Sequence, residues 1–456
     1  MDCVDHALLF AGVEALASRA NVDDTREPYD ARRKKSVIDI QFSVFQSAKP
    51  RSARAQSNDQ AIRQAGIEEV LRVGVDHVSL RGVSARAGLT HGATYARYED
   101  ANELLVDLWI SELQTRAIKL FTLCLNLCET PSEPALDEVI GLARNATSAD
   151  IASLHVLFAA RRIPVLLEEV EPFIVKYLQR ENCSSPVVSS AFTRAVCVYS
   201  IMAAQIMYSY HEDRPDDCLD KLKTWLLPTL RTNPADVAPI PGVAPKAPFL
   251  DIHTTDLKSR IALATYQVVG KSGYTHATLS RIARRARCST GAIYGLYSSK
   301  EALVADTYNL ANHTRWRRNN NFTNILDEGV LSQLLFETGS SVNSTWCNYL
   351  LEFSIATNFS PVLFETISHE TSSIGEMIQL LAGLGNEEKV VLMGMVTNFS
   401  LLTYGLSYVA AACGTLECTN FAQFAEPFRQ QVRTSVGDTW DTLAEQVNLL
   451  AAQLDT

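Results

Sequence analysis

Residues 289–297 are Ser-Thr-Gly-Ala-Ile-Tyr-Gly-Leu-Tyr, and residues 90–98 are Thr-His-Gly-Ala-Thr-Tyr-Ala-Arg-Tyr. Both stretches have glycine, alanine and two tyrosines at the same places, and Gly92 and Gly291 are 199 residues apart. Carried upstream without a gap, this spacing pairs apolar residues with apolar residues: Ile62 with Ile261, Val70 with Val269, Leu80 with Leu279 and Ala87 with Ala286. A repeat of this length predicts a duplicated domain rather than a recurring short motif.

The similarity continues beyond the front of each copy. Residues 164–166 and 361–363 are both Pro-Val-Leu, now 197 residues apart, and residues 233–254 between the copies contain five prolines, which is typical of a semi-extended linker. The expected organisation is a basic, partly disordered extension over 1–57, a helix-turn-helix over 58–104, a helical body over 105–232, the linker over 233–254, a second helix-turn-helix over 255–303 and a second body over 304–456.

Apolar residues recur at helical spacing and strand patterns are almost absent, so the fold class is predicted to be all-α. Each copy should begin with a helix of about four turns that ends at a glycine able to take a positive φ, Gly74 or Gly273. Capping residues expected to start these helices are Asn58 or Asp59 in the first copy and Thr255 or Asp256 in the second.

Ser79 and Thr278 stand where the next helix needs an N-cap, and a tight turn follows Ala87 or Ala286. A third short helix then opens on Thr90 or Ser289. Two short helices joined by such a turn form a helix-turn-helix, whose second helix fits the DNA major groove.

The second copy, with Thr-Leu-Ser-Arg-Ile-Ala at 278–283 and Tyr-Ser-Ser-Lys-Glu-Ala-Leu at 297–303, resembles the tetracycline-repressor (TetR/AcrR) family of bacterial regulators, and the first copy resembles it less closely. The resemblance implies that Gly291 allows close approach to DNA, that Tyr294 and Lys300 contact phosphates, and that Tyr297 packs inward. It also implies that each body encloses a ligand pocket and pairs with a partner through its last two helices.

Charge supports DNA binding by the second copy independently of the resemblance. The chain has a net charge of −10, yet residues 258–300 contain basic residues and no Asp or Glu. Base contacts are expected from Thr290, Ala292, Ile293 and Gly295. In the first copy acidic residues offset the charge of the arginines, and Ala101 stands at the position of Lys300, so weaker DNA binding is expected. A basic tail of Lys49, Arg51 and Arg54 could compensate by contacting phosphates or a minor groove. Arg287 stands where the family has glycine, which predicts local strain.

The DNA-binding residues predicted from these patterns lie on both helix-turn-helix motifs. They are Ser79, Thr90, His91, Gly92, Thr94, Tyr95, Thr278, Arg281, Ser289, Thr290, Gly291, Ala292, Tyr294 and Lys300.

The pairing helices are predicted over 187–210 and 216–230 in the first body and over 388–412 and 421–436 in the second. Because one chain supplies two units, we expect them to pair within the chain, although a homodimer of chains stays open. Any effector should be small and largely apolar. Candidate ligand residues, for which ordinary core packing is the favoured interpretation, are His155, Tyr199, Gln205, Tyr208, Trp346, Tyr349, Asn398 and Tyr404.

Other classes of protein have little support. The sequence has no P-loop, nucleophile elbow, dinucleotide fingerprint or metal-ligand spacing, so we expect no enzyme activity, metal or cofactor. No uninterrupted apolar run is long enough for a membrane span, and ten scattered cysteines fit a reducing bacterial cytoplasm, where a regulator would associate with the nucleoid. The expected function is a ligand-responsive repressor acting on duplex DNA; the alternative is a sensing or protein-interaction adaptor that keeps the fold with little DNA binding.

Overall fold

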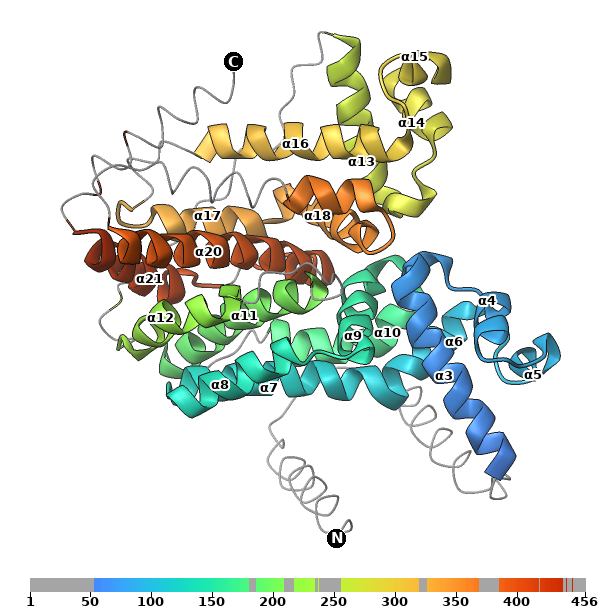
Figure 1. Cartoon of the computed structure of the whole chain (residues 1–456), viewed down its shortest axis with the longest axis horizontal. Coiled ribbons are helices and arrows are strands. Elements are labelled where there is room, and N and C mark those ends of the chain that lie inside the picture. Colours follow the sequence, from blue (N-terminus) through green and yellow to red (C-terminus); the bar gives the residue numbers. More distant parts are fainter. Residues whose placement is uncertain are drawn as a thin grey trace, which may run out of the picture. The chain divides into compact units, whose positions relative to one another are not determined.

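The computed structural model describes residues 53–179, 186–208, 217–233, 237, 256–319, 326–368, 385–417, 419–437, 440 and 445. The described residues are helical or irregular and include no strand, so the fold is all-α, as predicted (Figure 1). The chain divides into two units, Met1–Ser57 and Asn58–Thr456. Lys49, Arg51 and most of the proline-rich linker lie outside the described residues.

The first copy opens with the helices that we call the first head. They are α3 (Ala53–Val73), the short η1 (Val75–His77), α4 (Leu80–Arg86) and α5 (His91–Tyr95), and α6 (Ala101–Leu108) leads away from them. The predicted cap at Asn58 or Asp59 is wrong, because α3 already begins at Ala53 and the Asp59 carboxylate forms an ion pair with Arg97. Alanine, arginine and glutamine at 53–56 are good helix formers and extend the helix backward.

The first body follows as a stack of apolar helices. A π-helical turn, η2 (Trp109–Leu113), joins α6 to α7 (Gln114–Glu129). The remaining elements are α8 (Glu133–Arg144), α9 (Ser148–Ala159), η3 (Ala160–Arg162), α10 (Pro164–Phe173), η4 (Ile174–Leu178), α11 (Pro186–Tyr208) and α12 (Asp217–Arg231).

The second predicted copy has helices in a similar order. Its second head consists of α13 (Leu257–His276), α14 (Leu279–Ala286), α15 (Thr290–Tyr294) and the start of α16 (Lys300–Asn319). The second body consists of the rest of α16, α17 (Val330–Gly339), η7 (Ser341–Asn343), α18 (Ser344–Thr357), a helical segment over 361–368, α20 (Asn386–Cys413) and α21 (Ala422–Val436). Asp256 caps α13 by accepting the backbone N–H of Ser259, one of the two caps predicted there.

The four helices expected to pair lie against one another (Figure 1). α11 packs against α20 so closely that a Cβ on Gly405 would overlap the backbone of Ser200. α12 packs against both α20 and α21, with the Trp225 ring 4.9 Å from that of Phe428. A continuous apolar core therefore runs through both bodies.

The stretch Ser190–Tyr208 in α11 is the one described helix segment that is long and apolar enough to cross a membrane, although Arg194 and Gln205 interrupt it. However, 94% of that window is buried inside the protein against α7 and α20. Burial on this scale is what a core helix of a packed bundle requires.

Candidate nucleic-acid interface

The second head is a small helical unit with its own apolar core. Thr278 caps α14 by accepting the N–H of Arg281 at 3.3 Å, and Ser289 caps α15 by accepting the N–H of Ala292 at 3.1 Å. Both caps were predicted, and each satisfies a donor that a helix start leaves open. The core beneath these helices consists of Ile261, Ala264, Ile282, Ala283, Ala286, Ile293, Tyr297 and Leu303.

Tyr297 packs inward, as the resemblance implied. Its ring is buried, and its hydroxyl donates to the Asp306 carboxylate at 2.7 Å, which joins the head to α16. Burial and the neighbouring carboxylate raise the pKa of Tyr297, so the phenol keeps its proton.

The outer surface of the second head is strongly positive. Arg281, Arg284, Arg285 and Arg287 are all exposed, and none forms an ion pair within the described part of the chain. Arg281 donates to the carbonyl of His276 and Arg285 to the amide of Gln267, both at 2.8 Å. Neither acceptor carries a charge, so all four guanidinium groups keep their positive charge available to an anionic partner.

The short helix α15, which follows these arginines in the chain, has an exposed aromatic side chain. Tyr294 is 62% exposed, and Thr290 and Gly291 are exposed with it. A Cβ at Gly291 would meet only the Ser289 hydroxyl, at 3.6 Å, so a surface can approach closely there. The expectation that Ile293 contacts bases is wrong, because this side chain is fully buried in the core of the head. Ala292 is half-buried.

Arg287 is strained as predicted. It has φ 55° and ψ 49°, and it is the one non-glycine residue with a positive φ among the described residues. Its counterpart 199 residues earlier is Gly88, with φ 65°. An L-residue in this left-handed region costs roughly 1–2 kcal/mol, so the arginine at this turn lowers the stability of the second head.

The Lys300 side chain lies against Tyr274, on the side of the second head that faces the first. Its ammonium group donates to the carbonyl of Tyr274 at 2.6 Å and lies 3.9 Å from the centre of that ring. Partial burial lowers the pKa of Lys300. A contact between Lys300 and a phosphate stays a prediction, and it would require this side chain to leave Tyr274.

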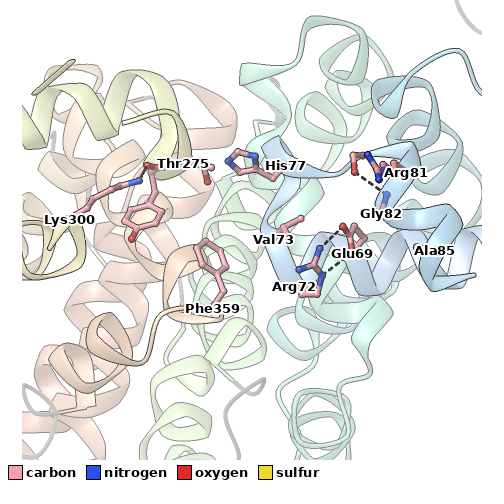
Figure 2. A pocket seen from close by; sticks show the side chains of 12 residues that line it. Glu69, Arg72, Val73, His77, Arg81, Gly82, Ala85, Thr275, Lys300 and Phe359 are labelled. Atoms are coloured by element: carbon pink, nitrogen blue, oxygen red, sulfur yellow. Dashed lines mark hydrogen bonds and ion pairs between the residues drawn. The ribbon is translucent and has the colours of Figure 1, made fainter. Parts of the chain in front are cut away.

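Lys300 also lines a cavity of about 630 Å³ to which both heads contribute (Figure 2). His77 and Arg81 reach it from the first head, and Thr275 from the second. Ser79, a predicted DNA-binding residue, lies on the same cavity. The rings of His77 and His276 are 5.5 Å apart, and burial together with the neighbouring His276 lowers the pKa of His77.

The first head has the same helices with different side chains. Ser79 caps α4 by accepting the N–H of Gly82, whereas Thr90 begins α5 without a side-chain capping bond. His91 and Gly92 are exposed, and Tyr95 is 52% exposed. The prediction that Thr94 contacts DNA is wrong, because its side chain is fully buried and accepts a hydrogen bond from Ser84 at 2.8 Å.

The positive surface of the second head has no equivalent in the first. Where the second head has Arg281, Arg284 and Arg287, the first has Gly82, Ala85 and Gly88. Arg86, the counterpart of Arg285, forms ion pairs with Glu68 and Glu69, both at 3.4 Å. Glu69 also lies over Gly82, where a Cβ would overlap its carboxylate. The first head therefore presents much less unpaired positive charge.

The residues predicted to bind a ligand contribute to the core of the two bodies. All are buried except Tyr208, which is half-buried, and none of them lines the cavity between the heads or the second cavity described below. Several make specific packing contacts: the Tyr349 hydroxyl donates to the carbonyl of Val304 at 2.9 Å, and His155 Nε2 lies 3.2 Å from the Asn358 amide. These contacts fit the favoured interpretation of core packing.

No group of three or more potential metal-binding side chains occurs in the part of the chain that the structure describes. Residues 261–307 match the family model of bacterial regulatory proteins of the tetR family. The match covers α13 from Ile261, all of α14 and α15, and the first turns of α16. No curated protein matches the chain. The second head is therefore a helix-turn-helix domain of the kind found in tetR-family regulators, and it supports a function in DNA-binding transcriptional regulation.

Proposed function

We propose that the chain is a ligand-responsive transcriptional repressor made of two TetR-like units that pair with each other within one chain. The exposed surface of α14 and α15 carries this proposal. There Tyr294 is exposed, and so are four arginines that form no ion pair within the described residues. Such a surface can contact the two sugar-phosphate backbones that border a major groove.

Equivalent local geometry in the two heads supports duplication. Gly74 has φ 78° and ψ 158°, and Gly273, 199 residues later, has φ 81° and ψ 155°. The Tyr98 hydroxyl donates to Asp107 at 2.7 Å, just as that of Tyr297 donates to Asp306. Shared backbone conformations and a shared buried hydrogen bond at one spacing are expected of two copies of one unit.

Packing between the last two helices of each copy supports pairing within the chain. Besides the close contact of Gly405 with Ser200, Arg194 on α11 donates to the carbonyl of Gln423 on α21 at 2.8 Å. A linker holds the two copies at high local concentration, which favours this pairing over association of separate chains. One chain would then present two different heads to DNA, and the operator should contain two unlike half-sites.

Selection of bound duplexes from a random DNA pool by the full-length chain, followed by footprinting and a stoichiometry measurement, tests the proposal. We expect protection of two unlike half-sites by one chain per duplex. A palindromic site protected at two chains per duplex would contradict pairing within the chain. If no duplex sequence is enriched, DNA recognition itself is contradicted.

The second candidate function is a sensing or protein-interaction adaptor. The ion pairs of Arg86 with Glu68 and Glu69 favour the adaptor, because they neutralise a positive charge that the first head would need to bind phosphates. The two candidates differ in their response to Tyr294→Phe. A repressor loses duplex affinity with this substitution, whereas an adaptor keeps its activity.

A further inference from the structure

A second cavity, of about 680 Å³, lies between the two copies on residues of both. The first copy contributes the start of α6 and the turn from η3 into α10, and the second contributes α13, the start of α18 and the end of α20. Its polar lining includes Arg161, Arg162, Lys271, Asn102, Ser344 and Asn348.

One of the three cations in this lining is already neutralised. Arg162 forms an ion pair with Glu352, which is 4% exposed, and a second with Asp76 at 3.0 Å. Glu352 in turn accepts the backbone N–H of Tyr274 at 2.7 Å. This network links the first head, the first body, the second body and the second head through residues in direct contact.

The other two cations have no counter-charge in the described part of the chain. Arg161 donates through Nε to the carbonyl of Ala412 at 2.9 Å, and its two terminal nitrogens have no acceptor among the described residues. Lys271 is exposed and forms no hydrogen bond or ion pair with a described residue. The side-chain amides of Asn102 and Asn348 also have no partner among these residues. The cavity thus has two positive charges without a carboxylate partner and neutral hydrogen-bonding groups, and its one lining carboxylate, Asp76, is paired with Arg162.

Two helices begin at the same cavity and add to its positive potential. α10 begins at Pro164, which has no N–H, and α18 begins at Ser344, whose N–H already donates to the carbonyl of Ser341. The contribution of these helix ends is therefore the helix dipole, which favours an anion near an N-terminus.

We propose that this cavity binds a small organic anion with two or more negative charges, of the polycarboxylate or phosphate class. Such a ligand would contact Lys271 of the second head and Arg161 of the first body, directly beside the Arg162 network. If the chain is the repressor proposed above, binding there changes how firmly the two heads are held relative to each other and hence their joint affinity for DNA.

Calorimetric titration of the full-length chain with citrate or inorganic pyrophosphate, at constant ionic strength and without DNA, tests the site. Comparing the two probes distinguishes a carboxylate ligand from a phosphate ligand. We expect saturable binding of at least one of them, weakened about tenfold or more by Lys271→Gln, because a charge-assisted hydrogen bond is lost. Asn348→Asp, which keeps the side-chain shape and adds a negative charge, should weaken binding at least as much.

Two substitutions serve as controls. Lys119→Gln removes an exposed charge from α7, and Arg284→Gln removes one from the DNA-facing surface of the second head. Both should leave anion affinity unchanged. The proposal is overturned if neither probe binds saturably, or if Lys271→Gln and Asn348→Asp bind as tightly as the two controls.

A second measurement separates this site from the proposed function. Duplex affinity is measured with and without the anion that binds, at equal ionic strength. Coupling of the site to the heads is supported if the anion changes the duplex affinity of the unsubstituted chain and does not change that of Asn348→Asp. Anion binding with no change in duplex affinity would leave the site intact and overturn the coupling.

Discussion

The hydroxyl of Tyr297 donates a hydrogen bond to the carboxylate of Asp306 at 2.7 Å, and Tyr98 and Asp107 form the same bond 199 residues earlier. In each head the carboxylate also pairs with a cation, Lys258 at 3.2 Å or Arg63 at 3.1 Å. Each hydrogen bond joins a helix-turn-helix to the helix that leads into its body, so the two heads are connected to their bodies by the same interaction.

Tyr297→Phe and Tyr98→Phe should each lower the free energy of unfolding by about 1 kcal/mol, because each removes one largely buried hydrogen bond and leaves the ring in place. Chemical denaturation of the two variants and of the unsubstituted chain measures this loss. A loss in only one of the two variants would contradict the equivalence of the heads.

Arg162→Gln should lower the free energy of unfolding by about 3 kcal/mol, since it leaves the carboxylates of Glu352 and Asp76 buried together without their cation. Arg116→Gln is a matched control, because Arg116 also bridges two acidic residues, Glu112 and Asp150, but at a more exposed position. Thermal or chemical denaturation compares them. Equal losses in the two variants would show that the buried network has no special role.

Arg287→Gly should raise the free energy of unfolding by about 1 kcal/mol, because glycine adopts φ 55° without the clash that an L side chain meets. Gly88→Ala, at the matched turn of the first head, should lower it by a similar amount. No atom lies within 4 Å of a Cβ at Gly88, so its effect is conformational. Denaturation without DNA measures both, and a destabilising Arg287→Gly would be inconsistent with strain at this turn.

Stability should fall on mild acidification through His155. Burial lowers the pKa of its imidazole from 6.5 to about 4 in the folded chain. Between these values the unfolded chain binds more protons, so the free energy of unfolding falls as the pH drops below 6.5, by about 2 kcal/mol at pH 5. His155→Gln should lose that part of the pH dependence in denaturation at pH 7.5 and pH 5. An unchanged dependence in the variant would exclude His155 as its source.

Features set within a few residues could be predicted from the sequence. Thr278 and Ser289 each cap a helix by accepting an N–H three residues later, so the short motif contains all of the geometry. The ends of the paired helices also followed from apolar periodicity. The prediction that Ile293 contacts bases was wrong because it took all of α15 to be exposed. A helix of five residues still needs a buried side chain to attach it to the core, and in α15 that side chain is Ile293.

Features that join distant residues could not be predicted. Arg162 is 86 residues from Asp76 and 190 residues from Glu352, and no local pattern connects them. The cavity beside them depends on how the two copies pack, which the sequence repeat does not specify. The turn of Lys300 onto Tyr274 is similarly a consequence of tertiary packing across 26 positions.

The salt dependence of duplex binding tests most directly the central claim, that the arginine surface of the second head binds DNA phosphates. A duplex selected by the chain is titrated at several salt concentrations with the unsubstituted chain, Arg284→Gln and the control Lys119→Gln. The account predicts weaker binding by Arg284→Gln and a slope of log affinity against log salt that is smaller by about 0.9, with Lys119→Gln unchanged. Equal slopes for all three proteins, or no salt-dependent duplex binding at all, would contradict it.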